Sequence, residues 1–381
     1  MNFELSPEQV GIVDSLKRFL VNDYSFDKRQ KYSSRPQGYS QEAWQMYADL
    51  GLLALPFPAE YDGLEGSSID TLLVMDTLGK ALCLEPYIST VVMCGTLLVE
   101  SGSEAQKQEL LPKIASGQIK LSFAHFESHM RNTFHLVKTT ATSTSGTWSI
   151  NGHKHVVLDA PSADYLIVSA RTKQNQNSED ESGISLFLIK SSTPGVTLHS
   201  YKTQDGGMAA DIEFNNVQFS ANNLLGNVND AYPMIEKILC FANAALCAEA
   251  IGVMTALNEF TLEYLKTRKQ FGVPIGKFQA LQHRMGDMFI STEQARSMAY
   301  LAALSLSDVD SKKRNRDCSA AKAYICKAGR QVGQEAVQLH GGMGVTNELN
   351  TAHYFKKMTM ITQTYGDYDY HLDKVSSFLV D

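Results

Sequence analysis

The hydrophobic spacing changes twice along the 381 residues of the chain, and this order restricts the fold more than any other feature. Residues 1–120 carry helical spacing, with a helix start at Ser6 and a helix stop at Gly117. Residues 121–228 carry short alternating runs, and residues 229–381 return to a long helical period. The sequence therefore predicts an α+β fold that is mostly α. Its parts are an N-terminal helical domain, a middle β barrel and a C-terminal four-helix bundle over these three ranges.

The middle region contains two turn signals. Ser145-Gly146 lies between alternating runs, and Asn151-Gly152 follows another short run. Asn-Gly between such runs is a strong hairpin signal because both residues tolerate a positive φ angle. We therefore expect a second turn at Asn151-Gly152.

Charge and composition argue against several classes of protein. The net charge is −7 at pH 7, which gives no general attraction to nucleic acid or to an anionic membrane. The first residues lack a basic segment followed by an apolar one, so no secretory signal is expected. No run approaches the ~18 continuous apolar residues of a membrane span. We expect a cytoplasmic protein without nucleic-acid or membrane partners.

Cysteine and histidine spacing predicts no metal site. The cysteines form no C-x-x-C pair, and the scattered histidines include no H-E-x-x-H motif. We interpret the cysteines as reduced thiols of the core. The six are Cys83, Cys94, Cys240, Cys247, Cys318 and Cys326.

Short motifs follow one another over nearly the whole chain. They occupy residues 50–56, 60–63, 102–112, 151–154, 214–217, 267–272, 278–279 and 338–344. In type and order these motifs resemble those of the acyl-CoA dehydrogenase family, whose R-x-x-F-G…Q and Q-x-x-G-G-x-G pair is the most specific. The N-terminal third and residues 365–367 are similar to the small subunit of pimeloyl-CoA dehydrogenase and related heteromeric members.

The resemblance implies FAD as cofactor, shared between neighbouring subunits. A guanidinium suits the pyrophosphate because it donates paired, directional hydrogen bonds, and glycines let backbone N–H groups approach a phosphate. Taken alone, an arginine at a helix end is usually a solvated charge and a Gly-Gly pair a helix stop. The cofactor-binding residues implied are Arg268, Phe271, Gln279, Gln338, Gly341 and Gly342.

The position of the catalytic base departs from the family pattern. The reaction needs a carboxylate within reach of the substrate α carbon. The family's usual glutamate position is Gly366 here, with Asp367 next to it, and the alternative position on the first bundle helix is Ala242. Asp367 is our catalytic candidate, and Glu249 is a second candidate for which a packing or ion-pair role is favoured. A partner subunit that supplies the base, or another flavin reaction, are the remaining explanations.

The middle domain departs as well. The family's flavin-contacting T-E-P-x-x-G-S-D loop is represented by residues 126–131, of which only Glu127 is kept. The family's W-I-T strand is replaced by Val156-Val157-Leu158. Both changes favour a subunit that works with a partner.

The function implied is FAD-dependent α,β-dehydrogenation of an acyl-CoA to the 2-enoyl-CoA, as in fatty acid β-oxidation, with electrons passed to an electron-transfer flavoprotein. The alternative is a non-catalytic or half-site subunit of a heteromeric acyl-CoA dehydrogenase. A flavin oxidase or a reductase is a third reading. A homo-oligomer or a heteromer is expected in each case, because Arg268 would serve a neighbour's cofactor.

Overall fold

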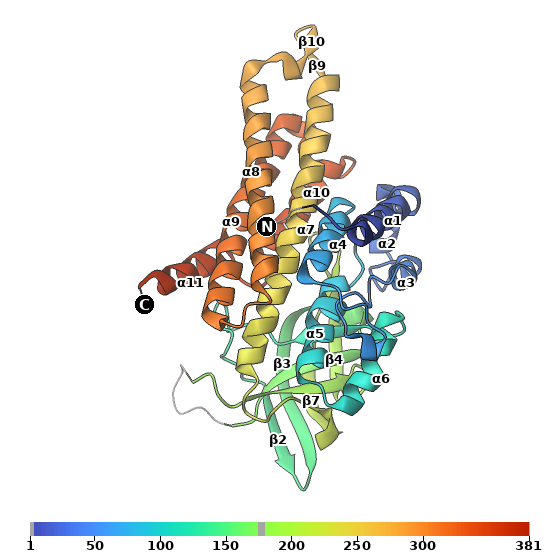
Figure 1. Ribbon diagram of the computed structural model, residues 1–381, viewed down its shortest axis with the longest axis vertical. Helices are drawn as coiled ribbons and strands as arrows, with labels where there is room; N and C mark the ends of the chain where they lie inside the picture. The colour runs from blue at the N-terminus through green and yellow to red at the C-terminus, as the bar shows by residue number, and fades with distance from the viewer. Residues whose placement is uncertain (1–3, 174–179, 381) are drawn as a thin grey trace. The chain divides into compact units, whose positions relative to one another are not determined.

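The computed structural model describes residues 4–173 and 180–380 (Figure 1). Helices come first, a sheet follows, and long helices complete the chain. The early helices are α1 (Pro7–Asp23), α2 (Phe26–Ser33), α3 (Gln41–Asp49), α4 (Ser68–Lys80), the π-helix η2 (Ile88–Gly95), α5 (Thr96–Ser101) and α6 (Glu104–Ala115). The elements change type from helix to strand between Ala115 and Leu121, and from strand to helix between Leu225 and Tyr232.

Local hydrogen bonds start several of the early helices. Ser6 caps α1 through a capping box, in which its hydroxyl accepts the N–H of Gln9 and the Gln9 side chain accepts the N–H of Ser6. Ser67 and Ser103 form the same box at α4 and α6. Each capping box joins two residues that are three positions apart. The helix start at Ser6 can therefore be recognised from the sequence.

The described residues cluster into two compact units. One contains those of Met1–Gln30, Ser67–Cys83 and Cys240–Asp381, and the other those of Lys31–Gly66 and Leu84–Leu239. The helices α1 and α4 therefore belong to the same compact unit as the C-terminal helices.

The second unit contains an eight-stranded sheet with the order β6-β7-β3-β2-β4-β5-β8, and β1 pairs with β4. Phe187 of β5 packs against Trp148 of β3 and Phe219 of β7, with both ring-centroid distances 5.1 Å, although these strands are not neighbours in the sheet. The sheet therefore curls around one apolar core, as in a barrel. The strands are β1 (Leu121–Ala124), β2 (Thr140–Thr144), β3 (Thr147–Leu158), β4 (Tyr165–Arg171), β5 (Ile184–Lys190), β6 (Val196–Lys202), β7 (Met208–Ser220) and β8 (Leu224–Leu225).

The expected turn at Asn151-Gly152 is wrong. Both residues lie inside β3, where the pairing with β7 is shifted by an irregularity between Ile150 and Gly152. Gly152 has a φ of +146°, and a Cβ there would lie 2.7 Å from the Cα of Thr139. The glycine therefore lets β3 lie close to the segment that begins β2. The hairpin turn is made by Ser145 and Gly146, which both have a positive φ.

The first unit is built around α9, which packs against α8, α10 and α11. Four long helical stretches were expected, and α11 follows them as a further, shorter helix. The helices are α7 (Tyr232–Thr267), α8 (Gln279–Ser305), α9 (Ser311–His340), α10 (Asn350–Gln363) and α11 (Tyr368–Val380). The small strands β9 (Lys269–Gln270) and β10 (Val273–Pro274) join α7 to α8 at the far end of that helix pair (Figure 1).

Among the described residues, α7 alone is long and apolar enough to cross a membrane by length and composition. The most apolar stretch of α7 is 89% buried inside the structure, which is the property of a core helix. All six cysteines are buried, as expected of core residues.

Candidate functional site

The loop of residues 364–367 joins α10 to α11 and carries the candidate base Asp367. Tyr365 and Gly366 have φ angles of +58° and +109°, which reverse the chain direction between the two helices. The Asp367 Oδ1 atom accepts the backbone N–H of Tyr370 at 2.9 Å, so Asp367 caps the start of α11. The capping bond fixes the orientation of the carboxylate.

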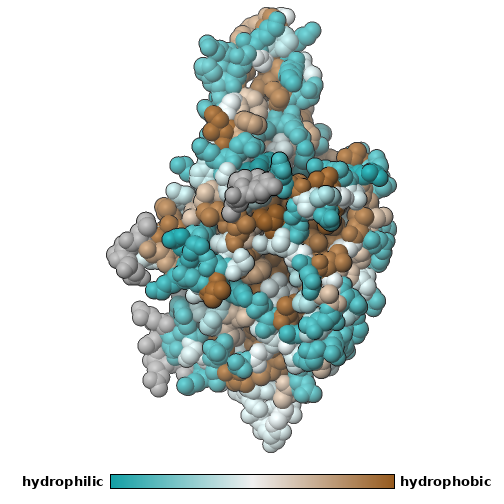
Figure 2. Space-filling view, viewed as in Figure 1, coloured by the Kyte–Doolittle hydropathy of each residue, from teal (hydrophilic) through white to brown (hydrophobic). Residues whose placement is uncertain are grey.

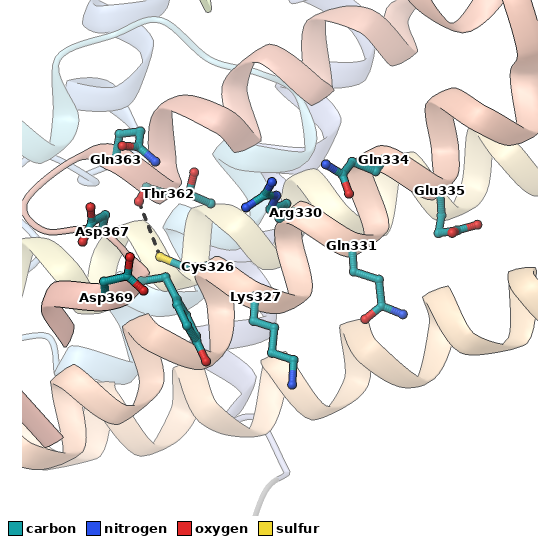
Figure 3. Close-up of a pocket in the computed structure, with 11 residues that line it drawn as sticks. Cys326, Lys327, Arg330, Gln331, Gln334, Glu335, Thr362, Gln363, Asp367 and Asp369 are labelled. Carbon is teal, nitrogen blue, oxygen red and sulfur yellow. Dashed lines mark hydrogen bonds between the residues drawn. The ribbon is translucent and has the colours of Figure 1, made fainter. Parts of the chain in front are cut away.

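Asp367 lines a cavity of about 520 Å³ between α9 and the α10–α11 segment. Figure 3 places Asp367 and Asp369 at one end of this cavity and Gln334 and Glu335 at the other, with Arg330 between them. The remaining lining residues are Cys326, Lys327, Gln331, Thr362, Gln363 and Tyr368. A second cavity of about 370 Å³ shares Arg330 and Gln334 with the first and therefore adjoins it.

The charges of the cavity are of both signs. In the described part of the chain, Lys327 and Arg330 form no ion pair, whereas Glu335 pairs with Arg284 at 2.6 Å. Two cations that are not neutralised, next to carboxylates at one end, suit a ligand with both anionic and neutral polar groups. The sequence did not single out Lys327 or Arg330, because each looks like an ordinary charge on an exposed helix face.

The other two base positions do not offer a free carboxylate. Ala242 is fully buried. Glu249 is only 4% exposed, and its Oε1 lies 2.8 Å from the Lys357 Nζ, which is the ion-pair arrangement favoured by the sequence.

Three of the predicted cofactor residues lie at the hairpin that ends the α7–α8 pair. Arg268 is exposed and, within residues 4–173 and 180–380, forms no ion pair. Phe271 is 90% exposed with a φ of +54°, and its ring meets that of Phe278 edge-on. Gln279 starts α8 and is exposed. Figure 2 shows this end of the surface as largely hydrophilic, with isolated hydrophobic patches.

The other three predicted cofactor residues lie at the C-terminal end of α9. Gln338 is in the last turn, and Gly341 and Gly342 begin the short helix η6 (Gly341–Val345). The ring of His340 lies 4.5 Å from that of Tyr264, whose carbonyl accepts the N–H of Arg268, so both sets meet at one end of the bundle.

This end of the bundle fits an anionic cofactor. A Cβ on Gly341 or Gly342 would meet no atom within 4 Å, so the backbone there is open to approach, and Arg268 lies at the same end. Asp367 lies about four turns away along α9, next to Cys326, which corresponds to roughly 20 Å at 1.5 Å per residue.

Glu127, the residue kept from the family's flavin loop, is in a buried ion pair. Lys154 is fully buried and its Nζ lies 2.7 Å from Glu127 Oε1. Burial lowers the pKa of Lys154 to about 8. Burial opposes ionisation of Glu127, but Lys154 and two backbone N–H groups outweigh it and lower the pKa of the carboxyl. The Glu127 carboxylate is therefore engaged by Lys154 and by the backbone N–H groups of Lys138 and Thr139, and it is not a free base.

Val156 stands where the family has the tryptophan of its W-I-T strand. It is half exposed with a φ of +50°, an unusual angle for a β-branched residue, and its N–H donates to Asp211 Oδ1 at 2.9 Å. The strand is therefore irregular at this point, beside the shift in pairing between Lys154 and Val157.

Three family models match successive parts of the chain. The acyl-CoA dehydrogenase N-terminal domain matches residues 6–118, the middle domain matches residues 123–221, and the C-terminal domain matches residues 232–379.

Individual proteins are similar over most of their length. A probable acyl-CoA dehydrogenase, YngJ of Bacillus subtilis, is 30% identical over 91% of each chain. An L-prolyl-[peptidyl-carrier protein] dehydrogenase of a Serratia species is 27% identical over 94% of this chain and 93% of its own. Among solved structures, the FAD complex of PigA superposes with a TM-score of 0.89 and 26% identity over 100% of this chain and 99% of its own.

Proposed function

The chain belongs to the acyl-CoA dehydrogenase family of FAD-dependent oxidoreductases, and from this premise we propose that it converts an acyl-CoA to the corresponding 2-enoyl-CoA. Bound FAD supplies the hydride acceptor for the β hydrogen. The protein's own task is to bind the thioester, remove the α proton and keep both groups aligned.

The observation that carries the proposal is the placement of Asp367. Its Oδ1 is held by the Tyr370 N–H while the residue lines the 520 Å³ cavity, so Oδ2 is the atom that takes the α proton. Arg330 and Lys327 in the same wall bind polar or anionic groups of the bound molecule.

The cofactor residues support a shared site. Arg268, Phe271 and Gln279 project from an exposed hairpin, far along the bundle from Asp367. We propose that they serve the FAD of a neighbouring subunit, together with Gln338, Gly341 and Gly342, in a homo-oligomer or a heteromer. An electron-transfer flavoprotein as acceptor, a cytoplasmic location and a role in fatty acid β-oxidation complete the proposal.

One observation favours a second function, that of a half-site subunit in a heteromer. The family's glutamate position is Gly366, and the space next to it is filled by the rings of Tyr370 and His371. A partner that carries the glutamate would then supply the base.

The test uses the purified chain, its visible spectrum, and anaerobic addition of acyl thioesters on CoA and on carrier protein. We expect bleaching of the flavin band by the wild type and a loss of ~10²–10⁴ in rate for Asp367→Asn, which keeps a capping side chain but cannot take a proton. Asp369→Asn, on the same cavity wall, is the matched control and keeps its rate. Equal rates for Asp367→Asn and wild type exclude Asp367 as the base. Bleaching that appears only with a co-purified second subunit supports the half-site function.

A further inference from the structure

Three buried polar side chains from three helices converge on the loop that precedes Asp367. Lys322 of α9 is 0% exposed, His371 of α11 is 3% exposed, and Asn243 of α7 is 4% exposed. None of them lines the cavity that contains Asp367.

The hydrogen bonds of these side chains end on two consecutive carbonyl groups. The Lys322 Nζ donates to the carbonyl oxygen of Thr364 at 2.6 Å and to Asn243 Oδ1 at 3.1 Å. The Asn243 Nδ2 donates to the carbonyl oxygen of Tyr365 at 3.3 Å, and His371 Nε2 lies 3.2 Å from the same oxygen. The network therefore links α7, α9 and α11 to residues 364 and 365.

The loop needs such support because its backbone is strained. Tyr365 has a φ of +58°, which is unfavourable for an aromatic residue, and it follows the end of α10, where carbonyl groups lack helical partners. A conformation of this kind persists only when its surroundings hold it. The three side chains provide that hold two and three residues before Asp367.

A buried lysine is a costly residue for a role that needs only hydrogen bonds, because its charge must also be buried. In the part of the chain that the structure describes, no carboxylate lies within ion-pair distance of its Nζ, and burial lowers the pKa of Lys322. The facing titratable groups are Cys326 on its own helix, Cys247 on α7, Asp367 on the loop and His371 on α11, and the first three favour the ammonium form. A buried ammonium with two neutral acceptors is costly, which points to a role beyond packing.

We propose that Lys322 and Asn243 are positioning residues that hold residues 364–365 so that the Asp367 carboxylate faces the cavity. The inference rests on the proposed function for the role of Asp367, whereas the hold on the loop is independent of it. Lys322 touches the loop backbone and acts through Asp367.

The first readout measures the loop itself. Amide hydrogen exchange of residues 364–371 is compared in the flavin-loaded full chain for the wild type, Lys322→Met and Asn243→Ala. We expect exchange at least about tenfold faster in both variants, which corresponds to loss of one buried hydrogen bond. Lys312→Met is the matched control, because Lys312 is an exposed lysine on the same helix α9. Unchanged exchange in both variants overturns the proposal, and Asn243→Ala carries the test if Lys322→Met does not fold.

The second readout separates positioning from general damage. With a thioester that bleaches the wild type, Lys322→Met should lower the rate of flavin reduction at saturation by ~10- to 100-fold, with the thioester dissociation constant within about threefold. If hydrogen exchange of the loop is faster but the rate of flavin reduction is not lower, the positioning role is overturned. If no thioester bleaches the wild type, or Asp367→Asn reduces as fast as the wild type, the proposed function or its base fails. The exchange result still decides whether the two residues hold the loop.

Discussion

Gly79 of α4 and Gly252 of α7 lie against each other with no room for a methyl group on either residue. A Cβ on Gly252 would overlap the carbonyl oxygen of Asp76 and lie 2.9 Å from the carbonyl carbon of Gly79. A Cβ on Gly79 would overlap the carbonyl oxygen of Glu249. The two helix backbones are therefore in direct contact within one compact unit.

This contact predicts opposite effects for the same substitution at two helical glycines. Gly252→Ala should destabilise the protein by about 2–4 kcal/mol, because the helices must separate. Gly286→Ala on α8, where an added Cβ meets no atom within 4 Å, should stabilise it by about 0.5–1 kcal/mol through helix propensity. Denaturant unfolding of both variants measures the two values, and a loss of equal size at both positions would contradict the close contact.

Restoring the family's glutamate should not restore a base. Gly366 has a φ of +109°, and a Cβ there would lie 2.6 Å from His371 Nε2 and overlap the ring of Tyr370. We expect Gly366→Glu to lower stability by about 1–3 kcal/mol and to reduce flavin no faster than the wild type. Thermal unfolding and anaerobic reduction measure the two effects. A stable variant with faster reduction would show that the loop has space for the longer acid.

Glu249 should matter for stability and not for chemistry. Removing one partner of its buried ion pair with Lys357 is expected to cost about 3–5 kcal/mol. Glu249→Gln should therefore lower the midpoint of unfolding, while the reduction rate per bound flavin stays within about threefold of the wild type. A large rate loss at full flavin occupancy would instead make Glu249 the base.

His371 should make the protein sensitive to acid. Burial lowers the pKa of His371 to about 3, with Lys322 adding to the effect. The unfolded chain takes up a proton below about pH 6.5 and the folded protein does not, so stability falls as the pH drops from about 6.5 towards 3. The slope from one such group reaches at most ~1.4 kcal/mol per pH unit.

His371→Asn removes this titration, so the free energy of unfolding should fall less steeply as the pH is lowered. Urea unfolding of the variant and the wild type at a series of pH values gives the two slopes. Identical slopes for His371→Asn and the wild type would mean that His371 is protonated in the folded protein.

Arg268 should contribute to FAD affinity and little to stability. Loss of a charge-assisted contact to a pyrophosphate should weaken FAD binding by ~10- to 100-fold in Arg268→Ala. Lys269→Ala changes the adjacent exposed cation and serves as the control. Flavin fluorescence on dilution measures release. Equal affinity in the two variants would remove Arg268 from the cofactor site.

Much of the architecture follows from short-range patterns. The capping box at Ser6 involves residues three apart, and the long helices α7, α8 and α9 carry helical spacing over many turns. The Asn151-Gly152 dipeptide shows the limit of such reasoning. Its preference for a turn is overridden by pairing of β3 with β7 and by the close approach of Thr139, both made by distant residues.

The candidate site divides in the same way. The sequence by itself determined which residue types are present and in what order, including Asp367 beside Gly366 and Arg268 before Phe271, because motifs are properties of the chain. Only the tertiary structure decided that Asp367 caps α11 on a cavity wall and that Glu249 is paired with Lys357. It also decided that Lys322 holds a strained loop. The physical reason is that burial, pairing and backbone strain arise from groups that are distant along the chain and meet only when it folds.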